Sequence, residues 1–393
     1  MSPLDYSLLS PSKIRFGWGT RQECGELSKS LGRRARIVLG SRTLSKSPEY
    51  NEILDSFRDA GIEPHHLITI SREPEVADVD SSVKALLEHV PLEGDFLVGI
   101  GGGAALDLAK AVAAMATNRE GNSVKDFLEG VGRGLKITQP PLPMLAIPTT
   151  AGTGSEATKN AVISSYEPKF KKSLRSDLMV PDVVLIDPEL SVSVPPETTA
   201  YSGMDAITQC LESYISSRSQ PIPRAFALQG ARYAIPSIVE AVNDPYSRSA
   251  RERMAHAALL SGMALANSGL GMAHGVAAAL GVHCKVPHGL ACAVMLPVAL
   301  RVNQSVAQRR LVELARECGH GDEETSDAQV ADEFIARIER LCRAVKIPET
   351  LSALGVQRGQ IPEIVASSRG NSMSGNPREL SDEELQEILE GML

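Results

Sequence analysis

A change of pattern near the middle of the chain constrains its fold more than any other sequence feature. The first half alternates short β-forming runs with stretches of helical periodicity, and the second half carries long helical stretches rich in Ala and Leu. The β-forming runs cover residues 36–39, 67–70, 96–100, 144–147 and 183–186. Strands that alternate with helices favour a mainly parallel sheet covered by helices. The sequence therefore predicts an α/β domain followed by an all-α domain.

The change of pattern falls near residues 188–196, where the segment DPELSVSVPPE supplies the prolines and polar residues of a linker. A chain of 393 residues is long for a single compact domain. We therefore expect one domain over residues 1–190 and a second over residues 191–393.

Composition and charge indicate which kinds of molecule the protein binds. A net charge of −8 gives no electrostatic footprint for a nucleic-acid backbone or an anionic membrane. The N-terminal residues lack the pattern of a secretory signal, and the apolar stretch 255–280 is interrupted by polar residues. The six cysteines include no CxxC pair, which fits a reducing compartment. We expect a soluble, cytoplasmic protein that binds a small molecule, with no nucleic acid or membrane as partner.

A glycine run follows the predicted strand 96–100. Gly101, Gly102 and Gly103 lead directly into a helical pattern. A strand, a glycine turn and a helix N-terminus together offer bare backbone N–H groups and the positive end of a helix dipole, which suits a pyrophosphate. A tight turn without any ligand is the alternative interpretation of the same residues.

A second polar run, PTTAGTGSE, covers residues 148–156 and follows the predicted strand 144–147. Its hydroxyls and glycines can surround phosphate and ribose oxygens with hydrogen-bond donors without adding charge. In the alternative interpretation the run is a turn that caps the next helix through Ser155 or Thr153.

The helical half contains a candidate metal site. Asp205 and Gln209 stand four residues apart in a helical pattern and so project from one face. His274 and His288 are each followed by glycine, which leaves room for a close approach to each imidazole. Taken singly, each histidine is more often a buried core residue than a ligand, but the set is a plausible site for a divalent metal.

These segments resemble the iron-containing, or group III, alcohol dehydrogenase family. The resemblance rests on GGG-x-x-x-D-x-x-K at 101–110, PTTAGTGSE at 148–156, PDVVLIDP at 181–188 and NPR at 376–378. It implies a Rossmann-like dinucleotide-binding domain, a helical metal- and substrate-binding domain, and a cofactor in the cleft between them. The implied cofactors are NAD(P) and a divalent metal, Fe2+ or Zn2+.

The resemblance also implies residues that contact the dinucleotide. They are Gly102, Gly103, Asp107, Thr149, Thr150, Thr153 and Lys171. Lys172 is a neighbouring rival for the role of Lys171. Ala104 stands where the family usually has serine, so one hydroxyl contact is lost.

Ser41 bears on the choice between NAD and NADP. Members of the family that prefer NAD carry an aspartate at this position, and a carboxylate there accepts from the ribose 2′-OH and repels a 2′-phosphate. Serine removes that repulsion, and Arg42 beside it offers a partner for a 2′-phosphate unless it is simply a solvated loop residue. The sequence predicts that NADPH is accepted at least as readily as NADH.

The resemblance implies metal ligation by Asp205, His274 and His288, which match the family pattern directly. Gln209 stands where the family usually has histidine, and we expect it to act as a weaker oxygen ligand. A second departure is Ala278, where many members carry a histidine that relays protons or contacts substrate. His283 is the nearest residue able to take over that role, although it fits a polar helix-end position equally well.

The resulting prediction is a metal-dependent alcohol dehydrogenase or aldehyde reductase that transfers a hydride between NAD(P) and a small alcohol or aldehyde. Asp205, His274, His288 and His283 are its expected catalytic residues. The alternatives are a related polyol, hydroxy-acid or phosphonoaldehyde reductase, or a degenerate member that binds nucleotide without turnover. We also expect a homo-oligomer, and a dimer in particular.

Overall fold

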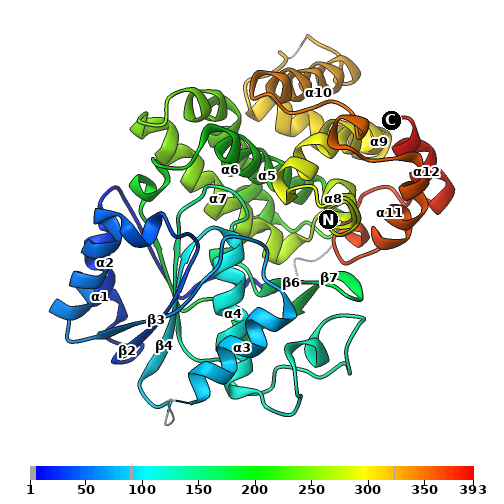
Figure 1. Ribbon diagram of the computed structural model, residues 1–393. Helices are drawn as coiled ribbons and strands as arrows, with labels where there is room; N and C mark the ends of the chain where they lie inside the picture. The colour runs from blue at the N-terminus through cyan, green and yellow to red at the C-terminus, as the bar shows by residue number, and fades with distance from the viewer. Residues whose placement is uncertain (1–5, 89–91, 323) are drawn as a thin grey trace. The chain divides into compact units, whose positions relative to one another are not determined.

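The computed structural model describes residues 6–88, 92–322 and 324–393 of the chain and divides into two compact units (Figure 1). One unit, here the α/β unit, comprises Ser10–Thr150 and Gly154–Ser193. The other, the helical unit, comprises Val194–Leu393 with Ala151–Thr153 and the residues before Ser10. The long C-terminal segment of the helical unit begins at Val194.

The α/β unit is built on a six-stranded sheet in which every pair of neighbouring strands is parallel, with the order β1-β8-β5-β4-β2-β3. Its strands are β1 (Lys13–Phe16), β2 (Arg34–Leu39), β3 (Glu63–Thr69), β4 (Asp95–Gly101), β5 (Met144–Pro148) and β8 (Val183–Ile186). The predicted parallel sheet is confirmed.

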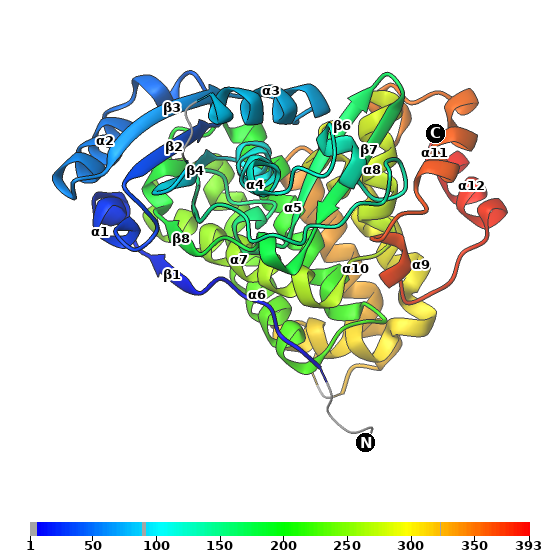
Figure 2. The ribbon, with the colours of Figure 1, turned by 90° about the horizontal axis from the view of Figure 1, so that it is seen from below.

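Helices cover both faces of this sheet. They are α1 (Cys24–Ser28), α2 (Pro48–Asp59), α3 (Val76–Leu87) and α4 (Gly103–Thr117). In Figure 1, α1 and α2 lie on one side of the strands, and α3 and α4 lie on the other. α3 packs along α4 (Figure 2).

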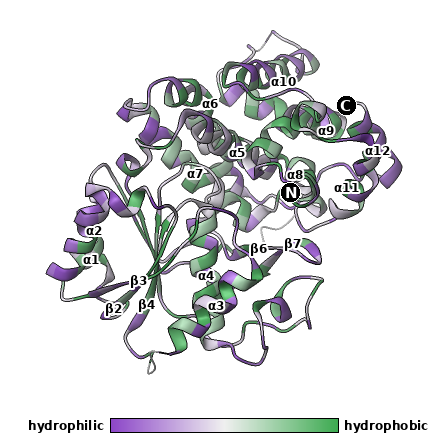
Figure 3. Cartoon of the chain, in the orientation of Figure 1, coloured by the Kyte–Doolittle hydropathy of each residue, from purple (hydrophilic) through white to green (hydrophobic). Residues whose placement is uncertain are grey.

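Burial on both faces explains why the inner strands β5 and β8 are continuously apolar. Ile37 of β2 and Val98 of β4 face a core that includes Phe57 of α2, whereas the next residues along, Val38 and Gly99, point to the opposite face. The sheet and the buried helix α4 are accordingly the most hydrophobic parts of this unit in Figure 3. A strand buried on both faces has no polar face to reveal by alternation.

The sheet order creates a switch point between β2 and β4. The chain leaves β2 toward β3 on one side and returns to β4 on the other, and ligands of open α/β sheets bind at such points, beyond the carboxyl ends of the strands. The two strand ends touch there: Gly40 N donates to Ile100 O at 2.7 Å, and a Cβ on Gly40 would lie 2.7 Å from Gly101 Cα. Only glycines fit this contact.

Three of the described strands were not predicted from the sequence. β1 is a four-residue edge strand that pairs only with β8, and β6 (Asn160–Tyr166) and β7 (Lys169–Arg175) form a separate antiparallel hairpin. The sequence of β7, KFKKSLR, buries only Phe170 and Leu174. Such strands carry too little apolar character to stand out from loop sequence.

The helical unit forms its core from helices alone, and the described residues of Val194–Leu393 include no strand. Its helices are α5 (Pro196–Ile215), α6 (Pro221–Asn243), α7 (Arg248–Ser268), α8 (Met272–Cys284), α9 (His288–Glu317), α10 (Asp327–Ala344), α11 (Ile361–Ser367) and α12 (Asp382–Glu390). Met204, Leu280, Met295 and Phe334 are among the side chains of one continuous hydrophobic core. The predicted all-α second half is confirmed.

Among the described residues, α9 is long and apolar enough to cross a membrane by length and composition. Helices α7 and α8 pass the same test only as a pair, with a bend of 100° between them. Leu290 and Leu300 of α9 belong to the hydrophobic core, and 61% of its apolar window is buried. This is the usual environment of a core helix.

Candidate functional site

The glycine run opens helix α4. Gly102 is the N-cap and Gly103 the first helical residue, so the free N–H groups of this helix end follow directly on β4. Thr150 comes from the second polar run, and its Oγ1 would lie 3.1 Å from a Cβ placed on Gly102. Thr149 N also donates to Gly101 O at 3.0 Å. The fold therefore brings the two motifs together at the switch point of the sheet.

The second run does not cap a helix through a hydroxyl. Gly154 stands at the N-cap of a short 3-10 helix, Ser155–Ala157, in a left-handed conformation with φ 59°. Ser155 Oγ instead donates to the Asp107 carboxylate on α4. Thr153 belongs to the helical unit.

Asp107 and Lys171 already have partners within the protein. Asp107 accepts from Ser155 Oγ and from Val162 N, and one of its oxygens lies 3.2 Å from Lys110 Nζ. Lys171 forms an ion pair with Glu73. Asp107 therefore ties the second run and β6 to α4, and Lys171 ties β7 to the segment around Glu73.

Ser41 lies just beyond the carboxyl end of β2, on the same side of the sheet as the glycine run. Its Oγ accepts from Leu44 N at 3.0 Å, which closes the turn after the strand. Ser41 is partly exposed and Arg42 is exposed, so both are accessible at this edge of the sheet.

A cluster of four metal-binding side chains forms within the helical unit. One donor atom from each of Asp205, His274, His288 and Cys292 lies within 4.8 Å of the other three. His274 Nε2 is 3.1 Å from Asp205 Oδ1, and His288 Nε2 is 4.0 Å from the same oxygen. Asp205, His274 and Cys292 are buried, and His288 is partly exposed. Three residues that the sequence predicted as ligands are thus brought together.

Helix ends position both histidines. His274 lies in the first turn of α8, and His288 is the first residue of α9. Gly289 lets α9 approach α5, because a Cβ there would lie 2.4 Å from Tyr201 O. Any larger residue would push His288 away from Asp205, which lies one turn farther along α5.

Glu212 orients His274 and was not predicted as a site residue. Its Oε2 lies 2.7 Å from His274 Nδ1, which directs Nε2 toward Asp205. The same carboxylate accepts from the backbone N–H groups of Gly271 and Ala273 and so caps α8. A carboxylate behind a histidine fixes the ring and makes it a better ligand. Glu212 follows Asp205 by seven residues, so the two carboxylates lie on one face of α5. This spacing is the sequence feature that could have identified Glu212 as a site residue.

Asn376 supports the same helix end. Its Oδ1 accepts from Met272 N at 3.0 Å and from Asn303 Nδ2 at 2.9 Å. The NPR motif near the C-terminus therefore holds the start of α8 against α9.

Burial and mutual contacts shift the pKa values of the side chains in the cluster. Burial raises the pKa of Asp205, but the hydrogen bond from His274 and the charge of His288 outweigh it and leave that pKa below its ordinary value. Burial lowers the pKa of His274, but Cys292, Asp205 and Glu212 raise it well above its ordinary value. Burial raises the pKa of the Cys292 thiol to about 12.

Gln209 and His283 do not share the cluster's contacts. Gln209 is buried one turn after Asp205, and its Oε1 accepts from Ser261 Oγ at 2.7 Å. His283 lies near the other end of α8 from His274, with Nε2 2.7 Å from Ser367 Oγ and Nδ1 3.3 Å from Glu363 Oε2. This is the helix-end position that the sequence left open as its alternative.

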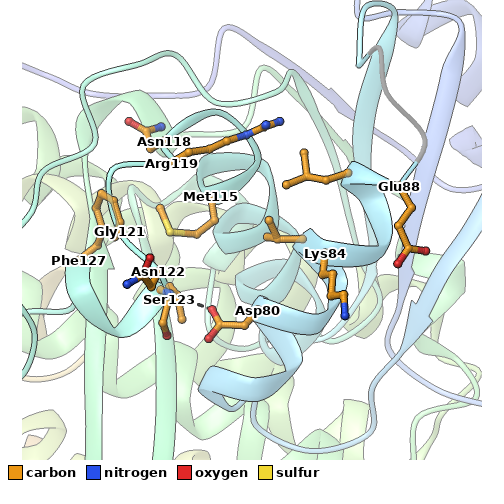
Figure 4. A pocket seen from close by; sticks show the side chains of 13 residues that line it. Asp80, Lys84, Glu88, Met115, Asn118, Arg119, Gly121, Asn122, Ser123 and Phe127 are labelled. Carbon is orange, nitrogen blue, oxygen red and sulfur yellow. Dashed lines mark hydrogen bonds between the residues drawn. The ribbon is translucent and has the colours of Figure 1, made fainter.

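A surface hollow of the α/β unit lies apart from these residues. It is formed by α3, the end of α4 and the following loop, with Lys84, Met115 and Phe127 among its lining (Figure 4). None of the predicted site residues lines it. The hollow therefore contributes nothing to the candidate site.

The donors of the cluster fit a divalent ion. Carboxylate oxygen, imidazole nitrogen and thiolate sulfur are the ligands that zinc and related transition metals take in proteins. Their mutual separations are short enough for one ion to contact all four. The cluster can therefore hold the kind of ion that the sequence predicted.

Comparisons with known proteins agree with this geometry. Residues 11–188 match the family model "Iron-containing alcohol dehydrogenase", and residues 199–393 match "Fe-containing alcohol dehydrogenase family, C-terminal". The chain is 34% identical to alcohol dehydrogenase 4 of Saccharomyces cerevisiae (strain YJM789), with 87% of this chain and 86% of that protein covered. It is 30% identical to the NADPH-dependent butanol dehydrogenase of Clostridium saccharobutylicum, with 97% and 96% covered.

A solved structure of 1,3-propanediol oxidoreductase superposes with a TM-score of 0.92 at 30% identity, covering 99% of this chain and 100% of that one. Matches of this length and identity, over both the sheet and the helices, extend to the enzymatic activity. The chain belongs to the iron-containing alcohol dehydrogenase family and is an NAD(P)-dependent oxidoreductase that acts on alcohols.

Proposed function

We propose that this enzyme interconverts a small alcohol and its aldehyde at a divalent metal held by Asp205, His274 and His288, with Fe2+ or Zn2+ as the ion. The observation that carries the proposal is the convergence of these three donors from α5, α8 and α9. When bound, the ion supplies a Lewis acid for the substrate oxygen, and NAD(P) supplies the hydride acceptor or donor.

The protein's own residues bind and orient the ion and the dinucleotide. Asp205 offers an anionic oxygen, His274 offers Nε2 while Glu212 fixes its ring, and the partly exposed His288 borders the side open to solvent. In the α/β unit, Gly102, Gly103, Thr149 and Thr150 present donors to the pyrophosphate at the N-terminus of α4. Asp107 positions that polar run through its contact with Ser155, and Lys171 anchors the β6–β7 hairpin through Glu73.

The direct test is a scan of alcohols and aldehydes with the purified protein, following the absorbance of the reduced cofactor, together with metal analysis of the same sample. We expect turnover of at least one short alcohol or aldehyde that depends on one divalent ion per chain. Cofactor binding without turnover of any substrate would instead support a degenerate member of the family.

A polyol or a related hydroxy-acid or phosphonoaldehyde substrate is the second candidate. It is favoured by the superposition on 1,3-propanediol oxidoreductase, whose name denotes a diol substrate. The same scan separates the two candidates when diols and anionic aldehydes are included.

We propose further that the chain works as a soluble cytoplasmic homodimer, without nucleic acid or membrane as partner. The net charge of −8 and the burial of α9 support this proposal. We also propose residues 1–190 and 191–393 as its cofactor and metal domains. Light scattering of the purified protein tests the dimer, and limited proteolysis tests the boundary.

Ser41→Asp should weaken the binding of NADPH to the enzyme. The new carboxylate can still accept from Leu44 N, so the turn survives, but it repels a 2′-phosphate. We expect the KM for NADPH to rise at least ~10-fold, which corresponds to about 1.4 kcal/mol, while the KM for NADH stays within about twofold. Steady-state kinetics with both cofactors measures the change.

The matched control is Ser41→Asn, which has nearly the same shape without the charge and should leave the ratio of the two KM values close to wild type. A Ser41→Asp enzyme that kept its use of NADPH would show that Ser41 does not contact the ribose. A strong preference of the wild-type enzyme for NADH would show that discrimination depends on other residues.

Glu212→Gln should weaken metal binding without touching a ligand. The amide loses the charge that makes His274 a better donor and orients its ring. Changes of this kind typically cost 10–100-fold in metal affinity, and we expect a loss of roughly that size. Competition with a chelator measures it, and Glu313→Gln, a change in an exposed ion pair, is the control. Unchanged affinity with a correctly folded protein would mean that His274 is held by its backbone alone.

A further inference from the structure

Cys292 joins the metal cluster although the sequence gave it no role. It lies on α9 one turn after His288, so both side chains project from one face of the helix. Cys292 Sγ lies 3.7 Å from His288 Nε2, and the side chain is fully buried. Its sulfur is one of the four donor atoms that lie within 4.8 Å of one another.

We propose that Cys292 is the fourth protein ligand of the divalent ion, binding as a thiolate in place of the amide oxygen of Gln209. The proposal rests on the proposed function, in which Asp205, His274 and His288 hold that ion. Binding is an exchange without oxidation: the S–H bond breaks, a sulfur–metal bond forms, and one proton leaves for solvent for each ion bound.

The distances support four donors around one ion. Metal–ligand bonds of 2.0 to 2.3 Å in a tetrahedral site place the donor atoms about 3.3 to 3.8 Å apart. The observed separations are 3.1 Å from His274 to Asp205, 4.0 Å from His288 to Asp205 and 3.7 Å from Cys292 to His288. Small side-chain adjustments bring all of them into that range.

Gln209 is the weaker candidate for the fourth position. Its Oε1 already accepts a hydrogen bond from Ser261 Oγ on α7 at 2.7 Å, and the same hydroxyl lies 2.8 Å from Ala258 O. This hydrogen bond occupies one lone pair of the amide oxygen, and a neutral amide oxygen is in any case a weaker ligand than a thiolate. Cys292 Sγ already lies among the donor atoms of the cluster, 3.7 Å from His288 Nε2.

A thiolate also changes which ion the site prefers. Asp205 and Cys292 together bring two negative charges, which balance a dication. Sulfur is a soft ligand, so this donor set favours zinc and cobalt over iron(II), manganese and magnesium. We therefore expect the protein to retain zinc in competition with equimolar iron(II).

Cobalt(II) substitution tests the proposal by absorption spectroscopy. The full-length protein is stripped with a chelator and titrated with Co2+ alone under anaerobic conditions. We expect one equivalent to bind, with the intense near-ultraviolet charge-transfer absorption that a cobalt–thiolate bond produces. Cys292→Ala should abolish that absorption and weaken cobalt binding at least ~10-fold, since even changes behind the ligands cost that much.

Two further variants test whether the effect is specific to the sulfur of Cys292. Cys210→Ala is the matched control, because Cys210 is equally buried in the helical core but its sulfur faces α6 at Gly230. It should keep both the absorption and the affinity. The double variant Gln209→His with Cys292→Ala restores four donors through an imidazole from α5 and should regain cobalt affinity without the sulfur band.

The outcomes separate this proposal from the proposed function. Wild-type protein that binds one cobalt without a thiolate band would overturn sulfur ligation and leave the three-residue site intact. Wild-type protein that binds no cobalt, or an unchanged cobalt affinity in His288→Ala, would overturn the proposed function and this inference with it. The wild-type spectrum decides the ligand even if Cys292→Ala fails to fold.

Discussion

His288→Ala is expected to lose both the bound metal and the activity. His288 is the first residue of α9 and contributes one of the four donors of the cluster, and alanine offers no replacement. A metal that polarises a substrate oxygen is worth several kcal/mol of transition-state stabilisation. Because each 1.36 kcal/mol is tenfold in rate, we expect kcat/KM to fall at least ~1000-fold. Metal analysis and steady-state kinetics on the same preparation measure both effects.

His65→Ala is the control for this experiment, because His65 lies on β3 with 45% of its side chain exposed and makes no contact with the cluster. It should keep wild-type metal content and turnover. If His288→Ala retained wild-type turnover in the presence of a chelator, the metal mechanism would have to be abandoned.

Lys110→Met should destabilise the α/β unit more than any surface change. Lys110 Nζ is buried and donates to Ser155 O at 2.9 Å, to Thr158 Oγ1 at 3.0 Å and to Asn160 O, with Asp107 Oδ1 at 3.2 Å. Burial lowers the pKa of Lys110, and the charge of Asp107 opposes that effect. Methionine fills the space but leaves Asp107 without its cation, and breaking such a pair costs about 3–5 kcal/mol.

The single tryptophan provides the measurement. Trp18 lies in the α/β unit, so its fluorescence during urea unfolding reports on that unit. We expect a clearly lower midpoint for Lys110→Met and no measurable shift for Arg309→Ala, which breaks only an exposed ion pair with Glu313. Equal midpoints for Lys110→Met and wild type would show that this buried network adds no net stability.

The main strands of the sheet were predictable because they are buried on both faces. β4 and β5 must be continuously apolar to pack between two layers of helices, and that requirement appears directly in the sequence. β1 pairs on one edge only, and β6 and β7 pair with each other over a largely polar surface. β1 depends on β8, a partner distant in the sequence, and the hairpin strand β7 buries too few side chains to give an apolar pattern.

Residue type and spacing indicated the glycine turn at 101–103 and a candidate metal set of Asp205, Gln209, His274 and His288, and the family resemblance implied Asp205, His274 and His288 as its direct ligands. Proximity across helices decided the rest. Cys292 joins the site because α9 packs against both α5 and α8, and Glu212 joins it because its carboxylate on α5 accepts from the backbone at the start of α8. His283 stays near the far end of α8, although it is closer to His288 in sequence than His274 is. Helical periodicity fixes which residues share a face, but only packing between helices fixes which faces meet, and a metal site depends on donor atoms a few ångströms apart.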